Sequence, residues 1–205
     1  MKIRDALISM YDKEGLDSLL EILDRHNVNI YASSGTADYI NNAGYKAQST
    51  ESITGISQIL GGRVKTISTE LFAGILAKKS DSTEGIPVVF DMIVVDLYPF
   101  EETLKNTDNH SEIIEKIDIG GISLIRAGAK NYSRVAVLSS KSQYSKVIEE
   151  MDFLHGEISI KTSKILASEA FALSSEYDSI ISSYLSGEKG KIHSESQSGE
   201  IIRIE

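Results

Sequence analysis

The sequence contains no cysteine and no tryptophan, and only two prolines and four histidines among its 205 residues. Without cysteine the chain has no disulfide framework, no thiolate metal site and no cysteine nucleophile. The histidines, His26, His110, His155 and His193, are scattered, and none stands at metal-ligand spacing from another histidine or from a carboxylate cluster. No candidate loop contains a histidine, which argues against a Ser-His-Asp triad.

Long apolar runs are also missing. No run approaches the ~20 residues that span a bilayer, and the charged start of the chain is unlike a signal peptide. We therefore expect a soluble cytoplasmic protein with no membrane contact. The 30 acidic and 21 basic residues give a net charge of −9, which argues against nucleic acid as a partner but leaves room for local cations that bind a phosphate.

Short apolar runs alternate with helical patterns along the chain. Runs at 3–9 and 28–32 each end in a polar loop that is followed by apolar residues at helical spacing, and further runs lie at 92–95 and 135–138. A long helix is predicted over 159–185. This order predicts an α/β domain with a mostly parallel central sheet, in which ligands bind at the carboxyl ends of the strands.

The composition changes after Leu185 to a run rich in serine, glycine, glutamate and lysine. We expect one domain over 1–186 and a flexible tail over 187–205, with 201–204 as a candidate final strand. No internal repeat is present. A chain of this length can bury roughly 70% of its unfolded surface, so the domain needs no metal or disulfide to fold.

A small-residue loop between the second predicted strand and its helix is a candidate phosphate cradle. Its open N–H groups lie at the positive end of the helix, and the end of the first strand adds a hydroxyl and a cation. The alternative is that Thr36 only caps the helix and Gly35 only makes a turn. Neither a Walker pattern nor Gly-x-Gly-x-x-Gly is present. The candidate phosphate ligands are Ser9, Lys13, Ser33, Ser34, Gly35 and Thr36.

Two other glycine pairs stand beside charged residues. After Gly61-Gly62, Arg63 and Lys65 share one face if the segment is extended, where they can bind an anion; a solvated basic loop is the alternative. Asp118 precedes Gly120-Gly121 and an apolar helical stretch that reaches Lys130, and an ordinary helix with an acid near its start is the alternative.

Tyr98 follows the interior strand predicted over 92–95. Such a tyrosine is usually a buried residue whose hydroxyl has a hydrogen-bond partner. The functional alternative is that Tyr98 is a catalytic proton donor.

Together, these segments resemble, in order and spacing, the inosine-monophosphate (IMP) cyclohydrolase domain of the bifunctional purine-biosynthesis protein. The likeness covers about residues 6–185 and is most specific at Gly-Arg-Val-Lys-Thr (62–66), Leu-Tyr-Pro-Phe (97–100) and Asp-Ile-Gly-Gly (118–121). It implies a methylglyoxal-synthase-like three-layer α/β fold. It also implies dehydrative ring closure of 5-formamidoimidazole-4-carboxamide ribotide (FAICAR) to IMP, the last step of purine biosynthesis, with no metal or organic cofactor.

The resemblance also implies residue roles. A cation or a phenol can stabilise the formyl oxyanion, and a carboxylate can accept the amide proton, but which residue takes which step stays open. Acid–base and oxyanion chemistry falls to Lys65, Tyr98, Asp118 and Lys130. Substrate binding falls to Ser9, Lys13, Ser33, Ser34, Gly35, Thr36, Arg63, Thr66, Asp96, Gly120 and Gly121.

The chain departs from the family pattern at four places. Tyr11 replaces a serine, Ser34 replaces a glycine, Asp96 replaces an asparagine, and 67–72 lacks two histidines. These changes motivate an alternative function, a non-catalytic nucleotide-binding or regulatory domain on the same fold. Methylglyoxal synthase activity is a third, but that family's acid cluster is not recognisable.

The family's second domain, a formyltransferase, has no counterpart in the sequence. The chain is either a monofunctional cyclohydrolase or a piece of a longer protein, and the tail favours the first. The expected partners are a purine ribonucleotide (FAICAR or IMP), a second copy in a homodimer, and a separate AICAR formyltransferase. The resemblance leaves open whether Lys130 serves its own subunit or a neighbour.

Overall fold

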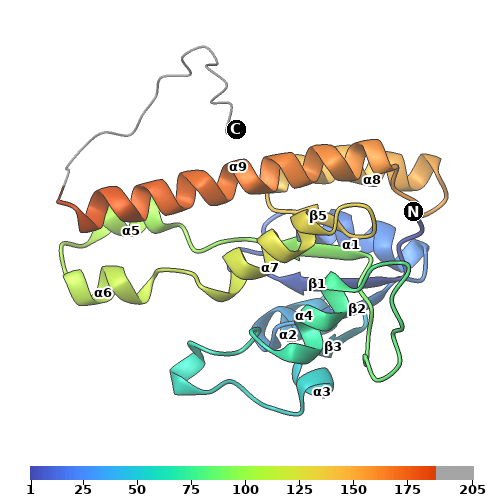
Figure 1. The fold of residues 1–205 in the computed structure, drawn as a ribbon, viewed down its shortest axis with the longest axis horizontal. Coiled ribbons are helices and arrows are strands. Elements are labelled where there is room, and N and C mark those ends of the chain that lie inside the picture. The colour runs from blue at the N-terminus through green and yellow to red at the C-terminus, as the bar shows by residue number, and fades with distance from the viewer. Residues whose placement is uncertain (188–205) are drawn as a thin grey trace.

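Five short apolar segments form a parallel sheet in the computed structural model, which describes residues 1–187 (Figure 1). The strand order is β3-β2-β1-β4-β5, so β1 lies at the centre, with Ala6 beside Ile30 of β2 and Met92 of β4. The predicted α/β class with a parallel central sheet is confirmed. The strands are β1 (Asp5–Ser9), β2 (Asn29–Ala32), β3 (Ala47–Ser49), β4 (Met92–Val95) and β5 (Ala136–Leu138).

Helices cover both faces of the sheet. Alternate strand residues point to opposite faces, so Ala6 and Ile8 of β1 pack with α1, α2 and α8, whereas Leu7 packs with α4, α7 and α9. The helices are α1 (Leu16–Arg25), α2 (Ser34–Asn42), α3 (Glu51–Thr54), α4 (Thr69–Leu76), α5 (Phe100–Asn106), α6 (His110–Glu115), α7 (Gly120–Lys130), α8 (Tyr144–Phe153) and α9 (Ile160–Leu185). Two single 3₁₀ turns lie at Leu60–Gly62 and Lys141–Gln143.

The helix predicted over 159–185 is confirmed as α9, whose start is capped by Ser159: the Ser159 hydroxyl accepts a hydrogen bond from the Thr162 N–H. The four predicted strands are also confirmed, within a few residues at each end. The sequence pattern gave no bounds for β3, α3, α4, α5, α6 or α8, which have three to ten residues each. The candidate strand at 201–204 and most of the proposed tail lie outside the described residues.

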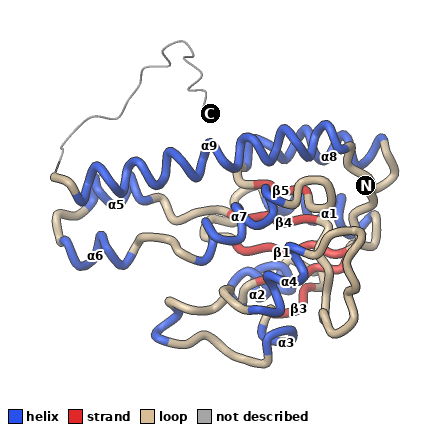
Figure 2. The backbone as a smooth tube through the Cα atoms, in the orientation of Figure 1, coloured by secondary structure: helices blue, strands red, loops and turns tan. Residues whose placement is uncertain are grey.

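The second half of α9 extends past the sheet. A helix of this length spans about 39 Å, more than the sheet beneath it can cover. Its far half packs with α5 and α6 around Phe100, Ile113 and Tyr177. Figure 2 shows that the loop from β4 to α5 and the loop from α6 to α7 both run beneath the second half of α9, and Lys116 contacts Tyr98 between them. None of the helices within 1–187 has the length and apolarity needed to cross a bilayer.

Candidate functional site

Three hydroxyl groups meet where β1 and β2 end. The Ser9 hydroxyl donates to Ser33 Oγ at 3.3 Å, and Ser33 Oγ donates to Thr36 Oγ1 at 3.2 Å. Thr36 Oγ1 in turn accepts from the Met10 N–H at 3.2 Å. We call Ser9, Ser33 and Thr36 the hydroxyl cluster. It adjoins the start of α2, whose first N–H groups have no acceptor within the helix, so the predicted cradle has the geometry to bind an anion.

The other residues of the predicted cradle lie at its rim. Ser34 is exposed, and its hydroxyl donates to the Glu51 carboxylate at 3.0 Å. A Cβ at Gly35 would meet open space, so this backbone is accessible from outside. The Lys13 ammonium donates to the Tyr11 carbonyl oxygen at 2.9 Å. The rim therefore carries one cation and one carboxylate, where sequence analysis expected only the cation.

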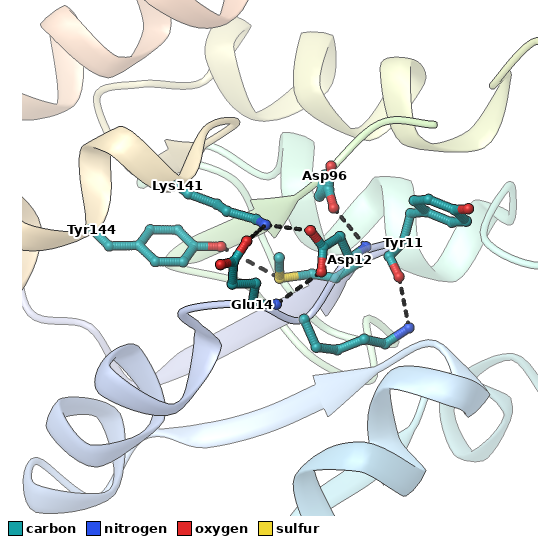
Figure 3. A network of polar contacts seen from close by, with 8 residues as sticks. Tyr11, Asp12, Glu14, Asp96, Lys141 and Tyr144 are labelled. Atoms are coloured by element: carbon teal, nitrogen blue, oxygen red, sulfur yellow. Dashed lines mark hydrogen bonds and ion pairs between the residues drawn. The ribbon is translucent and has the colours of Figure 1, made fainter. Parts of the chain in front are cut away.

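An ionic network crosses the carboxyl edge of the sheet (Figure 3). Lys141, which follows β5, reaches the carboxylates of Asp12 and Glu14 in the loop after β1. The hydrogen bond from Lys141 lowers the pKa of Asp12. On the other side, the Asp12 N–H donates to Asp96 Oδ2 at 2.7 Å. Burial raises the pKa of the Asp96 carboxyl, which sits where the family pattern has a neutral amide.

A second group, which we call the acid–base cluster, consists of Lys65, Tyr98, Lys116 and Asp118. Burial raises the pKa of Asp118, and three features oppose that rise: the Gly121 N–H, the charge of Lys65 and the backbone N–H of Tyr98. Lys116 Nζ donates to the Tyr98 hydroxyl oxygen at 3.2 Å. A carboxylate and a phenol therefore share one site, with the Lys116 ammonium in contact with the phenol and the charge of Lys65 acting on the carboxylate, as acid–base chemistry requires.

Gly120 and Gly121 allow two of these approaches. The Gly121 N–H donates to Asp118 Oδ1 at 2.6 Å, and a Cβ on Gly121 would lie 2.7 Å from Asp118 Oδ2. A Cβ on Gly120 would lie 2.6 Å from Thr66 Oγ1, and Thr66 is buried. Side chains at these positions would displace Asp118 and Thr66, which explains why two glycines begin α7.

Tyr11 connects the two clusters. Its ring lies 4.1 Å from the Tyr98 ring between centroids, and Tyr11 is two residues from Ser9 in the chain. The hydroxyl cluster and the acid–base cluster are thus neighbours along the carboxyl edge of the sheet, where ligands bind in parallel α/β domains.

Two predicted site residues lie apart from these clusters. The Arg63 guanidinium forms an ion pair with Glu115 of α6 and is mostly exposed. Lys130 is the last residue of α7, about 15 Å along the helix axis from Gly120. It lines a surface groove of about 740 Å³ together with Phe72, Leu76 and Phe171. In a single chain, Lys130 is not brought to Asp118.

Lys116 and Lys141 were not among the site residues predicted from the sequence. Lys116 stands two residues before Asp118, and in an extended segment this spacing puts two side chains on the same side. Lys141 stands three residues after the strand that ends at Leu138, so the strand-end rule that found Ser9 and Ser33 applies to it as well.

Comparison with known proteins assigns the domain to a family. The sequence profile of the MGS-like domain matches residues 15–123. The chain belongs to this MGS-like family. A second profile, that of the AICARFT/IMPCHase bienzyme, matches residues 128–203. The resemblance to the IMP cyclohydrolase region is therefore confirmed, and so is the methylglyoxal-synthase-like fold that it implied.

Individual relatives of this MGS-like chain point to the same family. The bifunctional purine biosynthesis protein PurH of Bacteroides thetaiotaomicron is 42% identical over 197 residues, which cover 92% of this chain and 38% of PurH. That of Sorangium cellulosum is 41% identical, covering 90% of this chain and 36% of PurH. The chain thus spans well under half the length of these relatives. The crystal structure of ForH superimposes with a TM-score of 0.75 at 26% identity, covering 89% of this chain and 98% of ForH.

Proposed function

We propose that this domain is an IMP cyclohydrolase, which closes the second ring of the purine in FAICAR with loss of water. The observation that carries the proposal is that Tyr98 and Asp118 lie with Lys65 at one edge of the sheet, beside the hydroxyl cluster. The relatives named PurH and the bienzyme profile support the same reaction class.

The reaction needs two proton movements around one new bond. The carboxamide nitrogen attacks the formyl carbon and forms an N–C bond, and the formyl C–O bond then breaks. The oxygen leaves as water with one proton from each of the two nitrogens, so the equation balances without a redox partner. The Asp118 carboxylate is suited to accept the nitrogen proton, while the Tyr98 hydroxyl and Lys65 ammonium stabilise the oxygen that gains charge.

The nucleotide phosphate would bind at the hydroxyl cluster and the start of α2. A phosphate accepts hydrogen bonds from N–H and O–H donors. The open N–H groups at the start of α2 would donate first, and the Ser9 and Ser33 hydroxyls, which donate within the cluster in this structure, would turn toward the phosphate on binding. The phosphate would be held at the hydroxyl cluster while the base lies at the acid–base cluster, which would keep the carboxamide against the formyl group. Such positioning supplies much of the rate of an intramolecular reaction.

A non-catalytic nucleotide-binding domain is the second candidate, and one observation favours it. The carboxylates of Glu51 and Asp96 stand near the places where a phosphate and a base would lie. Negative charge at these positions weakens binding of an anionic nucleotide and alters how the base is held. This candidate predicts that IMP binds without turnover of FAICAR.

The location, the oligomeric state and the source of the substrate follow from the same proposed function. We infer a cytoplasmic homodimer that acts on FAICAR made by an AICAR formyltransferase. The apolar side chains around the Lys130 groove, including Phe171 at 41% exposed, support a second copy as the occupant of that face.

The deciding experiment mixes the purified protein with FAICAR and follows IMP formation by ultraviolet absorbance, while calorimetry measures IMP binding. We expect turnover that Lys65→Ala abolishes and Lys79→Ala, a control at an exposed loop position, leaves unchanged. IMP binding with no turnover above the uncatalysed rate would favour the non-catalytic candidate, and loss of both would reject the nucleotide site.

A further inference from the structure

We propose that Lys116 is a positioning residue for Tyr98: it holds the phenol by its oxygen so that the phenol's own hydrogen points into the site. This inference rests on the proposed cyclohydrolase function. Lys116 belongs to none of the motifs that define the resemblance, and only its contact with Tyr98 in the structure indicates a role for it.

The contact between the two side chains is specific. Lys116 Nζ lies 3.2 Å from the Tyr98 hydroxyl oxygen and 4.5 Å from the centre of its ring. Both residues are half-buried, which reduces competition from water and strengthens the electrostatic part of the contact. The ammonium therefore lies over the ring face and nearer to its hydroxyl end, where it can both hold the oxygen and interact with the ring.

The backbone on either side of Lys116 is fixed. The Lys116 N–H closes the end of α6 by donating to the Ile113 carbonyl oxygen at 3.1 Å. Two residues later, the Asp118 N–H donates to the Tyr177 hydroxyl oxygen of α9 at 2.7 Å. Lys116 thus projects from a short segment held at both ends, which fixes the point from which its side chain reaches Tyr98.

The direction of the hydrogen bond follows from the groups themselves. An ammonium carries three donors and no acceptor, so the Tyr98 oxygen must accept. The single hydroxyl hydrogen of Tyr98 is then free to donate elsewhere. The Tyr11 ring packs against the Tyr98 ring at an interplanar angle of 38°, which restricts the movement of the Tyr98 ring. The hydrogen that remains is the one that a reaction at the formyl oxygen requires.

Charge makes the same contact useful during the reaction. When the Tyr98 hydroxyl donates its hydrogen to the formyl oxygen, negative charge grows on the phenol oxygen. The Lys116 ammonium is already in place to stabilise that charge, without reorganisation of water. This effect exists only in the transition state, so it should act on kcat and leave substrate binding nearly unchanged.

A purely structural role is the competing explanation, since the contact also connects the end of α6 to the loop after β4. If the contact were only structural, substituting Lys116 would lower the stability of the fold. Any loss of activity would then be the same whether or not residue 98 carries a hydroxyl. The test must therefore measure activity in both backgrounds.

Lys116→Met keeps the length of the side chain and removes the charge and the donors. We expect kcat for FAICAR to fall roughly 10- to 100-fold, the loss typical of one charge-assisted hydrogen bond, with KM and IMP affinity within about twofold of the wild type. Lys116→Arg, which retains a charged donor, should recover most of the activity. Lys105→Met on the exposed side of α5 is the matched control and should behave as the wild type.

The double variant decides between positioning and structure. In a Tyr98→Phe background the oxygen is gone, so Lys116→Met should produce little further loss. An equal loss in both backgrounds, an effect on KM alone, or wild-type kcat in Lys116→Met would each overturn the proposal. If Lys116→Met fails to fold by circular dichroism, Lys116→Gln serves in its place. Inactivity of the wild type would instead reject the cyclohydrolase function, and with it this role.

Discussion

The rings of Tyr11 and Tyr98 lie 4.1 Å apart between centroids, at an interplanar angle of 38°. Tyr11 comes from the loop after β1, and Tyr98 from the loop after β4, so one aromatic contact connects the two strand ends that carry the candidate site. The family pattern has a serine where Tyr11 stands, so this chain supports Tyr98 by a contact that a serine could not make.

Removing that contact should loosen Tyr98. We expect Tyr11→Leu to lower the free energy of unfolding by about 1 kcal/mol, the usual strength of an aromatic pair, and to lower FAICAR turnover several-fold. Urea unfolding and steady-state kinetics measure the two effects. Tyr11→Phe keeps the ring and is the control; identical behaviour of the Leu and Phe variants would show that the contact between the rings is not what holds Tyr98.

The start of α7 leaves no room for a side chain at Gly121. Gly121→Ala would put a methyl group 2.7 Å from the Asp118 carboxylate, so we expect it to displace Asp118. The expected result is a loss of about 1–3 kcal/mol in the free energy of unfolding, together with loss of most turnover. Gly35→Ala, where the added methyl meets open space, is the stability control. Normal turnover in Gly121→Ala would remove Asp118 from the mechanism.

The raised pKa of Asp118 links stability to pH. Because burial raises this pKa above its value in the unfolded chain, the folded protein binds the proton more tightly. The stability contributed by Asp118 therefore falls as pH rises from the unfolded pKa to the folded pKa.

Asp118→Asn keeps an oxygen that can accept from the Gly121 N–H but cannot ionise. We expect this variant to be more stable than the wild type at pH 7, with the difference vanishing toward roughly pH 3, where Asp118 is protonated in both states. We also expect it to be inactive. Urea unfolding at the two pH values measures this; a variant that is less stable at pH 7 would contradict the burial argument.

The strands and the hydroxyl cluster could be predicted from the sequence because both follow from local rules. The run Met92–Val95 is buried at every position, as expected of an interior parallel strand, and Ser9 and Ser33 follow from where strands end. Helices α5 and α6 have only seven and six residues, and are held by packing against α9 rather than by their own periodicity.

The positions of the other site residues depend on contacts between segments that are distant in the sequence. Arg63 looks like an anion ligand in the sequence, but it pairs with Glu115, which lies 52 residues away. Lys116 contacts Tyr98 only because the end of α6 returns beside the loop after β4. Neither pairing has a signature in local spacing, since each depends on how α6 packs against the second half of α9.

The location of Lys130 predicts the outcome of a mixing experiment. Lys130 lies at the far end of α7 from Asp118, so within the proposed homodimer we expect it to act in the site of the other subunit. Lys65→Ala and Lys130→Ala should each be inactive alone. Mixed dimers should regain activity, because one of their two sites then receives an intact Lys65 from one subunit and an intact Lys130 from the other. If both lysines served the same subunit, every site in a mixed dimer would carry one substitution, and refolded or co-expressed mixtures would stay inactive.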